Sequence, residues 1–347
     1  MEVRVVDLFC GAGGLTHGLM QAGLTVSAGI DIASECKFAY EFNNGSTFID
    51  KDVKDLSKED VLDLFGGANI KVLAGCAPCQ PFSTYTSSMD KTKDTKWPLL
   101  YEFERLIKET SPDIITMENV PGVIRHQVYT DFHDSLVKQG YFVWSGTIDC
   151  TKYGVPQKRE RHVLLASKYG EISFIPPSDN QVSVRDAIDW LPQIKDGQIC
   201  EIDPLHRASK LSKINKLRIK HSSPGGTWRD WPNELVADCH KKETGKGYAS
   251  VYGRMEWDKP SPTMTTLCYG FGNGRFGHPE QDRAISLREA ALLQTFPKNY
   301  QFAEDGNKIS MKATGKMIGN AVPVLLGKAI GDSIMSHLKE YIKRELI

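Results

Sequence analysis

The first half of the chain alternates short apolar runs with amphipathic stretches. The runs of strand length lie at 3–8, 25–30, 71–74 and 113–117, with a shorter one before Asp52. Stretches between them, such as 15–22, 34–42 and 99–108, carry apolar residues at helical spacing. Strands that alternate with helices along a chain predict an α/β fold with a doubly wound, mostly parallel sheet of the Rossmann type.

Residues that could carry chemistry follow the ends of these predicted strands. They are Gly11, Asp31, Asp52, Cys79 and Glu118. The carboxyl ends of parallel strands meet at one edge of a doubly wound sheet, and ligands bind there. The pattern therefore predicts a single edge that gathers these five residues into a site.

The pattern changes in the middle of the chain. From about residue 176 to 277 the periodicity weakens, and Pro, Gly, Trp, Ser and basic residues become frequent. Helical spacing then returns at 286–295 and 323–343. We therefore expect three segments, namely a catalytic and cofactor-binding domain at 1–175, a smaller loop-rich domain at 176–280, and a return to the first domain at 281–347.

The overall charge excludes one class of protein. Of 347 residues, 40% are hydrophobic and 25% are charged, and the formal net charge is zero. This neutral balance argues against a wholly basic nucleic-acid binder. Residues 205–231 nevertheless hold seven Lys and Arg against one acid, Asp230. Such a patch suits phosphate contacts, although a solvated surface face explains it equally well.

Signals for membranes, secretion and metals are weak. No apolar run approaches the roughly 18–20 residues that cross a membrane, and the N-terminus shows no signal peptide. The eight cysteines lack the pattern of a disulfide framework, and only Cys76 and Cys79 form a Cys-x-x-Cys pair. A zinc site would need a second such pair, and Cys239 with His240 stands alone. We expect a cytoplasmic protein without a metal.

A glycine turn follows the first predicted strand. Gly11-x-Gly13-Gly14 is similar to a dinucleotide fingerprint without its full spacing, and a purely structural tight turn is the alternative. Asp31 ends the second strand about 20 residues later, where a carboxylate can bind ribose hydroxyls. Asp52 could accept from an adenine amino group, and Phe9 offers a ring face to adenine.

Three further groups could act on a substrate. Cys79 stands between two prolines and is a candidate nucleophile; an inert buried cysteine and a redox pair with Cys76, as in a nicotinamide-dependent reductase, are the alternatives. Glu118 could share a proton, although a glutamate at a strand end is often a cap or solvated. Arg159 and Arg161 share one face of an extended segment and suit an anion, or they form a solvated edge.

Six motifs taken together resemble those of the DNA (cytosine-5)-methyltransferases. They occur in the order of that family and span nearly the whole chain, at 7–14 (Asp-Leu-Phe-Cys-Gly-Ala-Gly-Gly), 78–80 (Pro-Cys-Gln), 118–120 (Glu-Asn-Val), 157–161 (Gln-x-Arg-x-Arg), 288–297 (Arg-Glu-Ala-Ala-Leu-Leu-Gln-Thr-Phe-Pro) and 319–323 (Gly-Asn-Ala-Val-Pro). Residues 253–267 also look like the end of a target-recognition domain. The resemblance implies that the loop-rich domain recognises the target.

The resemblance also implies roles for single residues. Cys79 matches the nucleophile that adds to C6 of cytosine, Glu118 matches the residue that holds N3 and the exocyclic amine, and Arg161 with Arg159 matches a basic pair near O2. The implied cofactor is S-adenosylmethionine. Its implied binding positions are Phe9, Gly11, Ala12, Gly13, Asp31, Ile32, Asp52, Val53, Pro78, Leu99, Asn320 and Val322. Asn320 would also help to order the cleft. Trp97-Pro98 departs from the family pattern, which leaves the wall of the methionine pocket open.

The implied substrate is duplex DNA, from which the target cytosine must flip out because C5 cannot be reached inside a duplex. The stretch 84–96 looks like the loop that closes on the flipped base. The chain looks like a compact bacterial or phage restriction–modification enzyme, monomeric and nucleoid-associated, with a cognate endonuclease as a possible partner. Transfer RNA as the substrate and a non-catalytic relative remain alternatives. Candidate DNA-reading residues are Arg207, Arg218, Arg229, Arg254 and Arg275.

Overall fold

The computed structural model describes residues 2–78, 98–178 and 180–345. The chain divides into two compact units. The sheet unit comprises residues 1–153, 160–177 and 322–347, and the loop-rich unit comprises residues 154–159 and 178–321. Each unit is described by itself below.

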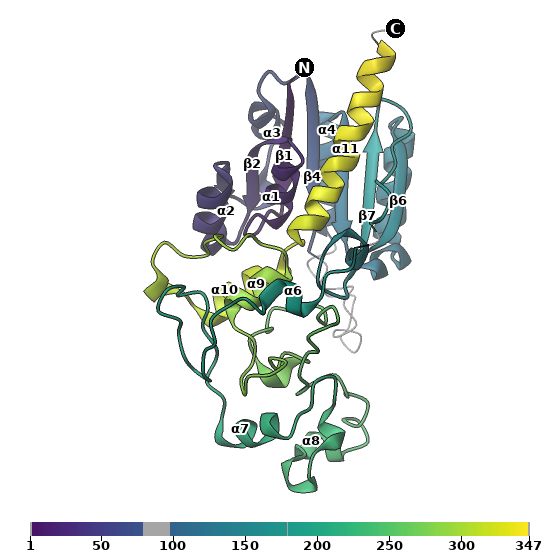
Figure 1. Cartoon of the computed structure of the whole chain (residues 1–347). Helices are drawn as coiled ribbons and strands as arrows, with labels where there is room; N and C mark the ends of the chain where they lie inside the picture. Colours follow the sequence, from purple (N-terminus) through teal and green to yellow (C-terminus); the bar gives the residue numbers. More distant parts are fainter. Residues whose placement is uncertain (1, 79–97, 179, 346–347) are drawn as a thin grey trace. The chain divides into compact units, whose positions relative to one another are not determined.

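The sheet unit is built on one sheet of seven strands (Figure 1). Its strands are β1 (Val3–Leu8), β2 (Thr25–Asp31), β3 (Thr47–Asp50), β4 (Ile70–Gly75), β5 (Ile114–Asn119), β6 (Phe142–Asp149) and β7 (Glu160–Ser167). Their order is β3-β2-β1-β4-β5-β7-β6, and the pairs among β1 to β5 are parallel. Only β7 pairs antiparallel, with both β5 and β6. The predicted doubly wound, mostly parallel sheet is confirmed.

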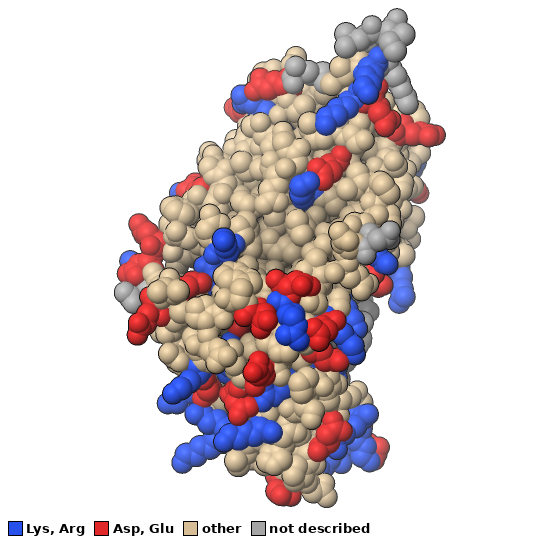
Figure 2. Space-filling model, viewed as in Figure 1, with Lys and Arg blue, Asp and Glu red and all other residues tan. Residues whose placement is uncertain are grey.

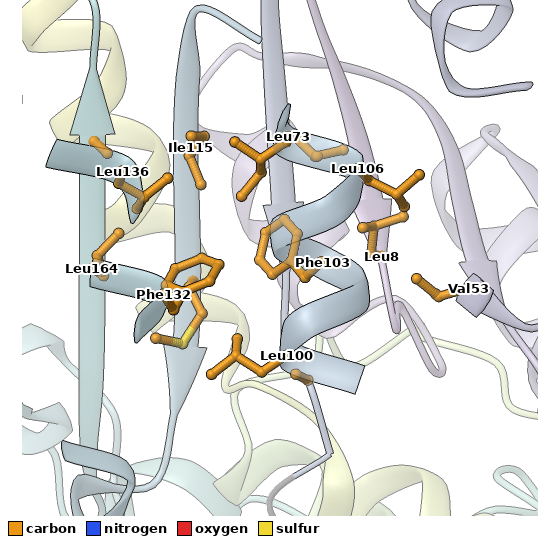
Figure 3. Close-up of a cluster of buried hydrophobic side chains, with 14 of the residues drawn as sticks. Leu8, Val53, Leu73, Leu100, Phe103, Leu106, Ile115, Phe132, Leu136 and Leu164 are labelled. Atoms are coloured by element: carbon orange, nitrogen blue, oxygen red, sulfur yellow. The ribbon is translucent and has the colours of Figure 1, made fainter. Parts of the chain in front are cut away.

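Helices cover the sheet. They are α1 (Gly14–Gln21), α2 (Lys37–Asn44), α3 (Lys58–Phe65), α4 (Pro98–Thr110), α5 (Gln127–Lys138) and α11 (Val324–Glu345). Figure 3 shows Phe103 on α4 and Phe132 on α5 packed over Leu73 and Ile115 of the central strands. All four side chains are fully buried. This apolar layer fixes the central strands against the helices and so fixes the strand ends that carry the candidate site.

Helices α1 and α11 pack very closely because glycines line their contact. A Cβ built on Gly18 would lie 2.3 Å from the Val324 carbonyl oxygen, and one on Gly327 would lie 3.0 Å from the Leu15 carbonyl oxygen. The first distance is one that real side chains do not reach. The backbones can therefore meet only while Gly18 carries no side chain.

Both units also contain short 3-10 helices. They are η1 (Ser34–Cys36), η2 (Val53–Asp55), η6 (Pro121–Arg125), η7 (Cys150–Tyr153), η8 (Trp228–Asp230), η9 (Asn233–Leu235), η10 (Phe271–Asn273) and η11 (Gly306–Lys308). The loop-rich unit contains the helices α6 (Val184–Ile188), α7 (Lys213–Lys220), α8 (Asp238–Lys241), α9 (Leu287–Leu293) and α10 (Met311–Asn320). In this unit the described residues form isolated β-bridges and no named strand.

Buried polar contacts organise the loop-rich unit. Arg254 donates to the carbonyl oxygens of Ser222, His278 and Ile219 at 2.8–3.0 Å. Arg283 is fully buried and donates two hydrogen bonds to the Glu289 carboxylate, at 2.8 and 2.6 Å. Burial opposes the charge of Glu289, but the Arg283 guanidinium overcomes it and lowers the Glu289 pKa to about 2.

The predicted return to the first domain at residue 281 differs from this division. Residues 281–321 lie in the loop-rich unit, and the chain returns to the sheet unit at Val322. The reason is visible in α9 and the residue after it. The Gln294 side chain donates to the carbonyl oxygen of Ile318 at 2.7 Å, and the Gln157 side chain donates to Gln294 at 2.8 Å. These internal contacts hold 281–321 within that unit. The functional assignment of the segments stays a prediction.

Candidate active site

Glu118 lies at the carboxyl end of β5, between two neighbouring strands. Cys76 comes directly after β4 on one side, and Arg161 lies near the start of β7 on the other. The Cys76 thiol donates to Glu118 Oε2 at 2.8 Å, and Arg161 Nε lies 2.9 Å from Glu118 Oε1. The sheet therefore brings the predicted acid and one predicted arginine into direct contact.

The Glu118 carboxylate is buried, with 3% of its surface exposed. Arg161 supplies a positive charge beside it, yet no hydrogen bond of good geometry reaches Oε1 from the described residues. A buried acceptor is normally satisfied, and an exception marks a position where a ligand can complete the hydrogen bonding. This geometry suits an oxygen that meets a donor group on a bound substrate.

Side chains on the opposite face of the same strands have a structural role. In the β5–β7 register, Asn119 pairs with His162. The His162 ring contacts the Tyr129 hydroxyl at 2.7 Å, and burial together with His133 lowers the His162 pKa to about 4. The imidazole is therefore neutral near neutral pH and is not a proton carrier for the site.

Asn119 holds the chain just before the predicted nucleophile. Its side-chain amide donates to the Ala77 carbonyl oxygen at 3.2 Å, and its Oδ1 accepts from the Val120 N–H at 2.9 Å. Pro78 follows and is half-buried. Cys79 itself, like the predicted closing loop 84–96, lies outside the described residues. The sequence reasoning did not assign a role to Asn119, although its place beside Glu118 was a signal for one.

Arg159 is placed differently from Arg161. It belongs to the loop-rich unit and is 4% exposed. Its guanidinium donates to the carbonyl oxygens of Met264 and Ala321, at 3.0 and 3.3 Å. These contacts give Arg159 a structural function within that unit, and its catalytic role stays a prediction.

The glycine turn and Asp31 meet as predicted for a cofactor site. Phe9, Gly11 and Gly13 all have positive φ, of 60°, 51° and 87°, which makes the turn tight. The Gly11 N–H donates to Asp31 Oδ2 at 2.9 Å, and the Ala33 N–H donates to Asp31 Oδ1 at 2.9 Å. A Cβ on Gly11 would meet nothing within 4 Å, so open space lies in front of the turn.

The other predicted cofactor residues are varied in exposure. Asp52 caps η2 by accepting from the Lys54 N–H at 3.0 Å. Ile32 is 67% exposed beside Asp31 and so presents an apolar surface against which a flat ligand could stack. Six positions complete the set, of which Ala12, Val53 and Val322 are buried, Pro78 and Leu99 are half-buried, and Asn320 is exposed in the loop-rich unit. The open turn, the Asp31 carboxylate and the exposed Ile32 fit an adenosine-like group.

Asp7 is a buried acid immediately behind this turn. It is fully buried on β1, and Thr16 Oγ1 donates to its Oδ2 at 2.6 Å. Burial raises the Asp7 pKa to about 7, the Thr16 hydrogen bond partly offsets that shift, and the charge of Asp31 adds to it. Asp7 Oδ1 accepts no hydrogen bond from the described residues. This acid is held at a cost to stability.

The five candidate DNA-reading arginines differ in their contacts. Arg207 donates to the carbonyl oxygens of Pro204, Ile309 and Gly306, Arg254 is buried as described above, and Arg275 is half-buried. Arg218 lies 5.6 Å from the Trp231 ring centroid, and Arg229 donates to the Lys246 carbonyl oxygen.

Figure 2 shows basic side chains gathered over the region of α7, whose lysines are exposed. These lysines are better placed for phosphate contacts than the buried Arg254.

Two expectations from the sequence concerned features that this protein would lack, namely a metal site and a membrane-spanning helix. Over residues 2–78, 98–178 and 180–345 the structure contains no cluster of three or more His, Cys, Asp or Glu side chains suited to a metal ion. In the same ranges no helix has the length and apolar character needed to span a membrane. The predicted absence of a metal and the predicted cytoplasmic location remain predictions.

Comparisons with known proteins give one consistent result. The family model for C-5 cytosine-specific DNA methylases matches residues 3–336, a range that includes all six motifs. The Type II methylase M.HgiDII of Herpetosiphon aurantiacus is 53% identical over 100% of this chain and 99% of its own length. The Type II methyltransferase M.Eco47II of Escherichia coli is 32% identical over 98% of this chain and 80% of its own. A solved structure of an E. coli prophage protein shares the fold, with a TM-score of 0.74, 24% identity and coverage of 97% of this chain and 100% of that one.

Proposed function

The chain belongs to the C-5 cytosine-specific DNA methylase family, and from this we propose that it methylates C5 of a cytosine within a specific sequence of duplex DNA. The observation that best supports the proposal is the buried Glu118 carboxylate, flanked by Arg161, at the end of β5 and next to β4 in the sheet. A carboxylate with one oxygen open to a donor is the group needed to hold a pyrimidine edge.

The proposed reaction uses covalent catalysis. The Cys79 thiolate adds to C6 of the cytosine, which makes C5 electron-rich. When bound, S-adenosylmethionine would supply an electrophilic methyl group, so that the C5–methyl bond would form as the methyl–sulfur bond breaks and the neutral thioether S-adenosylhomocysteine would be left. A base then removes the C5 proton, the C5–C6 double bond forms again, and the thiolate leaves. The product is 5-methylcytosine, and Cys79 is regenerated.

Glu118 and Arg161 would act on the charge that develops in the ring. When the thiolate adds to C6, electron density moves toward N3. A proton held between Glu118 and N3 would neutralise that charge, while a carboxyl oxygen of Glu118 accepts from the exocyclic amine. Arg161 keeps the buried carboxylate oriented and balances its charge, since an unpaired buried charge is costly. Arg159, as the second arginine of the motif, is proposed to assist near O2.

The cofactor would lie at the glycine turn. The open space at Gly11 accepts a ligand against the backbone, Asp31 accepts from ribose hydroxyls, and the exposed Ile32 packs against the adenine. Asp52 and Phe9 would complete the adenine site. These positions follow the general rule that ligands bind beyond the carboxyl ends of parallel strands.

The remaining elements of the proposal concern partners. The target cytosine flips out of the duplex, because C5 is otherwise unreachable. The loop-rich unit is proposed to recognise the target sequence. Relatives are named as a Type II methylase and a Type II methyltransferase, and a cognate endonuclease acting on the same sequence is proposed as a partner. We propose that the protein acts as a monomer.

A methylation assay with nucleoside analysis tests the function. The purified protein is incubated with mixed-sequence duplex DNA and labelled S-adenosylmethionine, and the labelled nucleoside is identified by mass spectrometry. We expect 5-methylcytosine. Label in transfer RNA instead of DNA would overturn the substrate, and label in neither would overturn the proposed reaction.

Two variants test the assigned roles. Cys79→Ala should abolish methyl transfer, and Glu118→Gln should lower it roughly 100-fold or more, the scale expected when a preorganised electrostatic group is lost. Glu59→Gln changes the same kind of side chain on the exposed surface of α3 and should leave the activity unchanged. Full activity in Cys79→Ala would contradict the covalent mechanism.

A further inference from the structure

The Cys76 thiol has a position that the sheet itself fixes. Its backbone N–H donates to the Leu8 carbonyl oxygen at 3.2 Å, which extends the pairing of β4 with β1 by one residue. Cys76 therefore stands on the end of a central strand and is half-buried. Its Sγ lies 2.8 Å from Glu118 Oε2. This contact comes from the strand next to β5, on the side away from Arg161.

The two neighbours of Glu118 differ in what they supply, since Arg161 provides a charge and Cys76 provides a hydrogen bond. Arg161 Nε is 2.9 Å from Oε1 and provides positive charge, but its approach does not form an aligned hydrogen bond. The thiol does donate a hydrogen bond, to Oε2. The last torsion of a glutamate side chain is broad, so a charge alone does not fix how the carboxylate is turned. A directional donor on one oxygen does fix it.

We propose that Cys76 is a positioning residue for Glu118, holding Oε2 so that Oε1 stays turned toward the substrate base. The proposal rests on the proposed methyl transfer and adds to it a residue outside the assigned site. It also gives the two cysteines of one motif different roles. Cys79 is the nucleophile, whereas Cys76 donates a hydrogen bond and keeps its proton throughout the reaction. No bond to Cys76 forms or breaks in the reaction.

Kinetics of two substitutions test the proposal. Cys76→Ala removes the donor, and kcat should fall roughly tenfold, the effect of losing one hydrogen bond to a charged group. The KM for S-adenosylmethionine should not change. Cys76→Ser keeps an O–H donor and should recover most of the activity. Cys150→Ala removes a fully buried thiol elsewhere in the sheet unit and serves as the control for loss of packing.

The balance between kcat and KM separates positioning from packing. The Cys76 thiol and the Arg161 guanidinium both contact the Glu118 carboxylate. Loss of the thiol in Cys76→Ala should lower kcat while the KM for S-adenosylmethionine stays in place. Cys150→Ala should change neither constant. An unchanged kcat in Cys76→Ala, or an equal loss of kcat in Cys76→Ser, would overturn the proposal.

A readout without enzymatic activity keeps this test independent of the proposed function. In a Cys79→Ser background, the peptide that carries Cys76 contains a single thiol, and its alkylation by iodoacetamide can be followed by mass spectrometry. Adding Glu118→Gln removes the carboxylate that accepts the hydrogen bond of the thiol, so the thiol is no longer held there and alkylation should become severalfold faster. Equal rates would show that the contact is absent. If the wild-type protein produced no 5-methylcytosine while alkylation accelerated, the methyl-transfer proposal would fail and the contact would stand.

Discussion

Replacing Asp7 by Asn should stabilise the protein, and more so as the pH rises. Asp7 is fully buried on β1, and burial raises its pKa from 3.8 to about 7. In the unfolded chain the carboxyl ionises near its ordinary value. Between those two pKa values the folded state binds the extra proton, so the free energy of unfolding falls by about 1.4 kcal/mol for each pH unit. Above the folded-state pKa the full penalty is present, about 4 kcal/mol from this shift.

The substitution removes that penalty and keeps the local contacts. An Asn side chain retains an oxygen that can accept from Thr16 Oγ1, the 2.6 Å hydrogen bond of the wild type. Between about pH 5 and pH 8 the penalty grows by roughly 2.5 kcal/mol, because the slope flattens near the folded-state pKa. For a unit of this size, 1 kcal/mol shifts the melting temperature by about 2–4 °C. The gain in melting temperature from Asp7→Asn should therefore be roughly 5–10 °C larger at about pH 8 than at about pH 5.

Calorimetric melting across this pH range is the assay. Asp63→Asn, an equivalent change on the exposed surface of α3, is the control and should show no pH-dependent gain. Thr16→Val removes the donor that opposes the shift, so the loss of stability should continue to higher pH than in the wild type. Equal effects of Asp7→Asn at both pH values, or a loss that grows toward high pH, would refute the reasoning.

Two further predictions concern packing and a buried ion pair. Gly18→Ala should cost at least 2 kcal/mol in the free energy of unfolding, because its Cβ would lie 2.3 Å from the Val324 carbonyl oxygen; Gly67→Ala, with open space around it, is the control, and equal melting temperatures would contradict the close α1–α11 contact. Glu289→Gln should destabilise the loop-rich unit by about 3–5 kcal/mol at neutral pH, since it leaves the buried Arg283 charge unpaired. Because the Glu289 pKa is lowered to about 2, the wild-type pair should lose its contribution as the pH falls from about 4.5 toward 2. Denaturant titration followed by the fluorescence of Trp228 and Trp231 measures the stability of the Glu289→Gln variant and the pH dependence of the wild type. A variant as stable as the wild type would show that the Arg283–Glu289 ion pair contributes nothing to stability.

The sheet could be predicted from the sequence because its signals are local. Each strand of the sheet unit is a short apolar run followed by a turn, and the carboxyl ends of parallel strands must meet at one edge. This rule alone placed Asp31 beside the glycine turn, a contact that the structure shows at 2.9 Å. It also placed Glu118 at the edge. It could not show that Arg161 and Cys76 flank that carboxylate, because neighbour relations among strands depend on topology.

The internal contacts of the loop-rich unit could not be predicted, for the opposite reason. Its order comes from side chains that bind backbone carbonyls far away in the sequence, as Arg254 does with Ser222 and His278. Such contacts leave no periodic pattern. For the same reason Arg254 looked like a DNA-reading residue, whereas its guanidinium is buried among carbonyl oxygens. The contact between Gln294 and Gln157, which keeps residues 281–321 with the loop-rich unit, is likewise invisible in the sequence pattern.

The carboxyl edge of the sheet carries two buried acids, and this combination is costly for a fold. Asp7 lies near the end of β1 and Glu118 near the end of β5, and each has an oxygen that accepts no hydrogen bond from the described residues. A core selected only for stability would satisfy or replace such groups, since each unsatisfied buried polar atom costs free energy. Their presence at the edge where ligands bind is typical of sites at which stability is exchanged for chemistry. If Asp7→Asn proves more stable yet binds S-adenosylmethionine more weakly, the acid behind the glycine turn serves the cofactor site. If binding is unchanged, Asp7 destabilises the fold without contributing to cofactor binding.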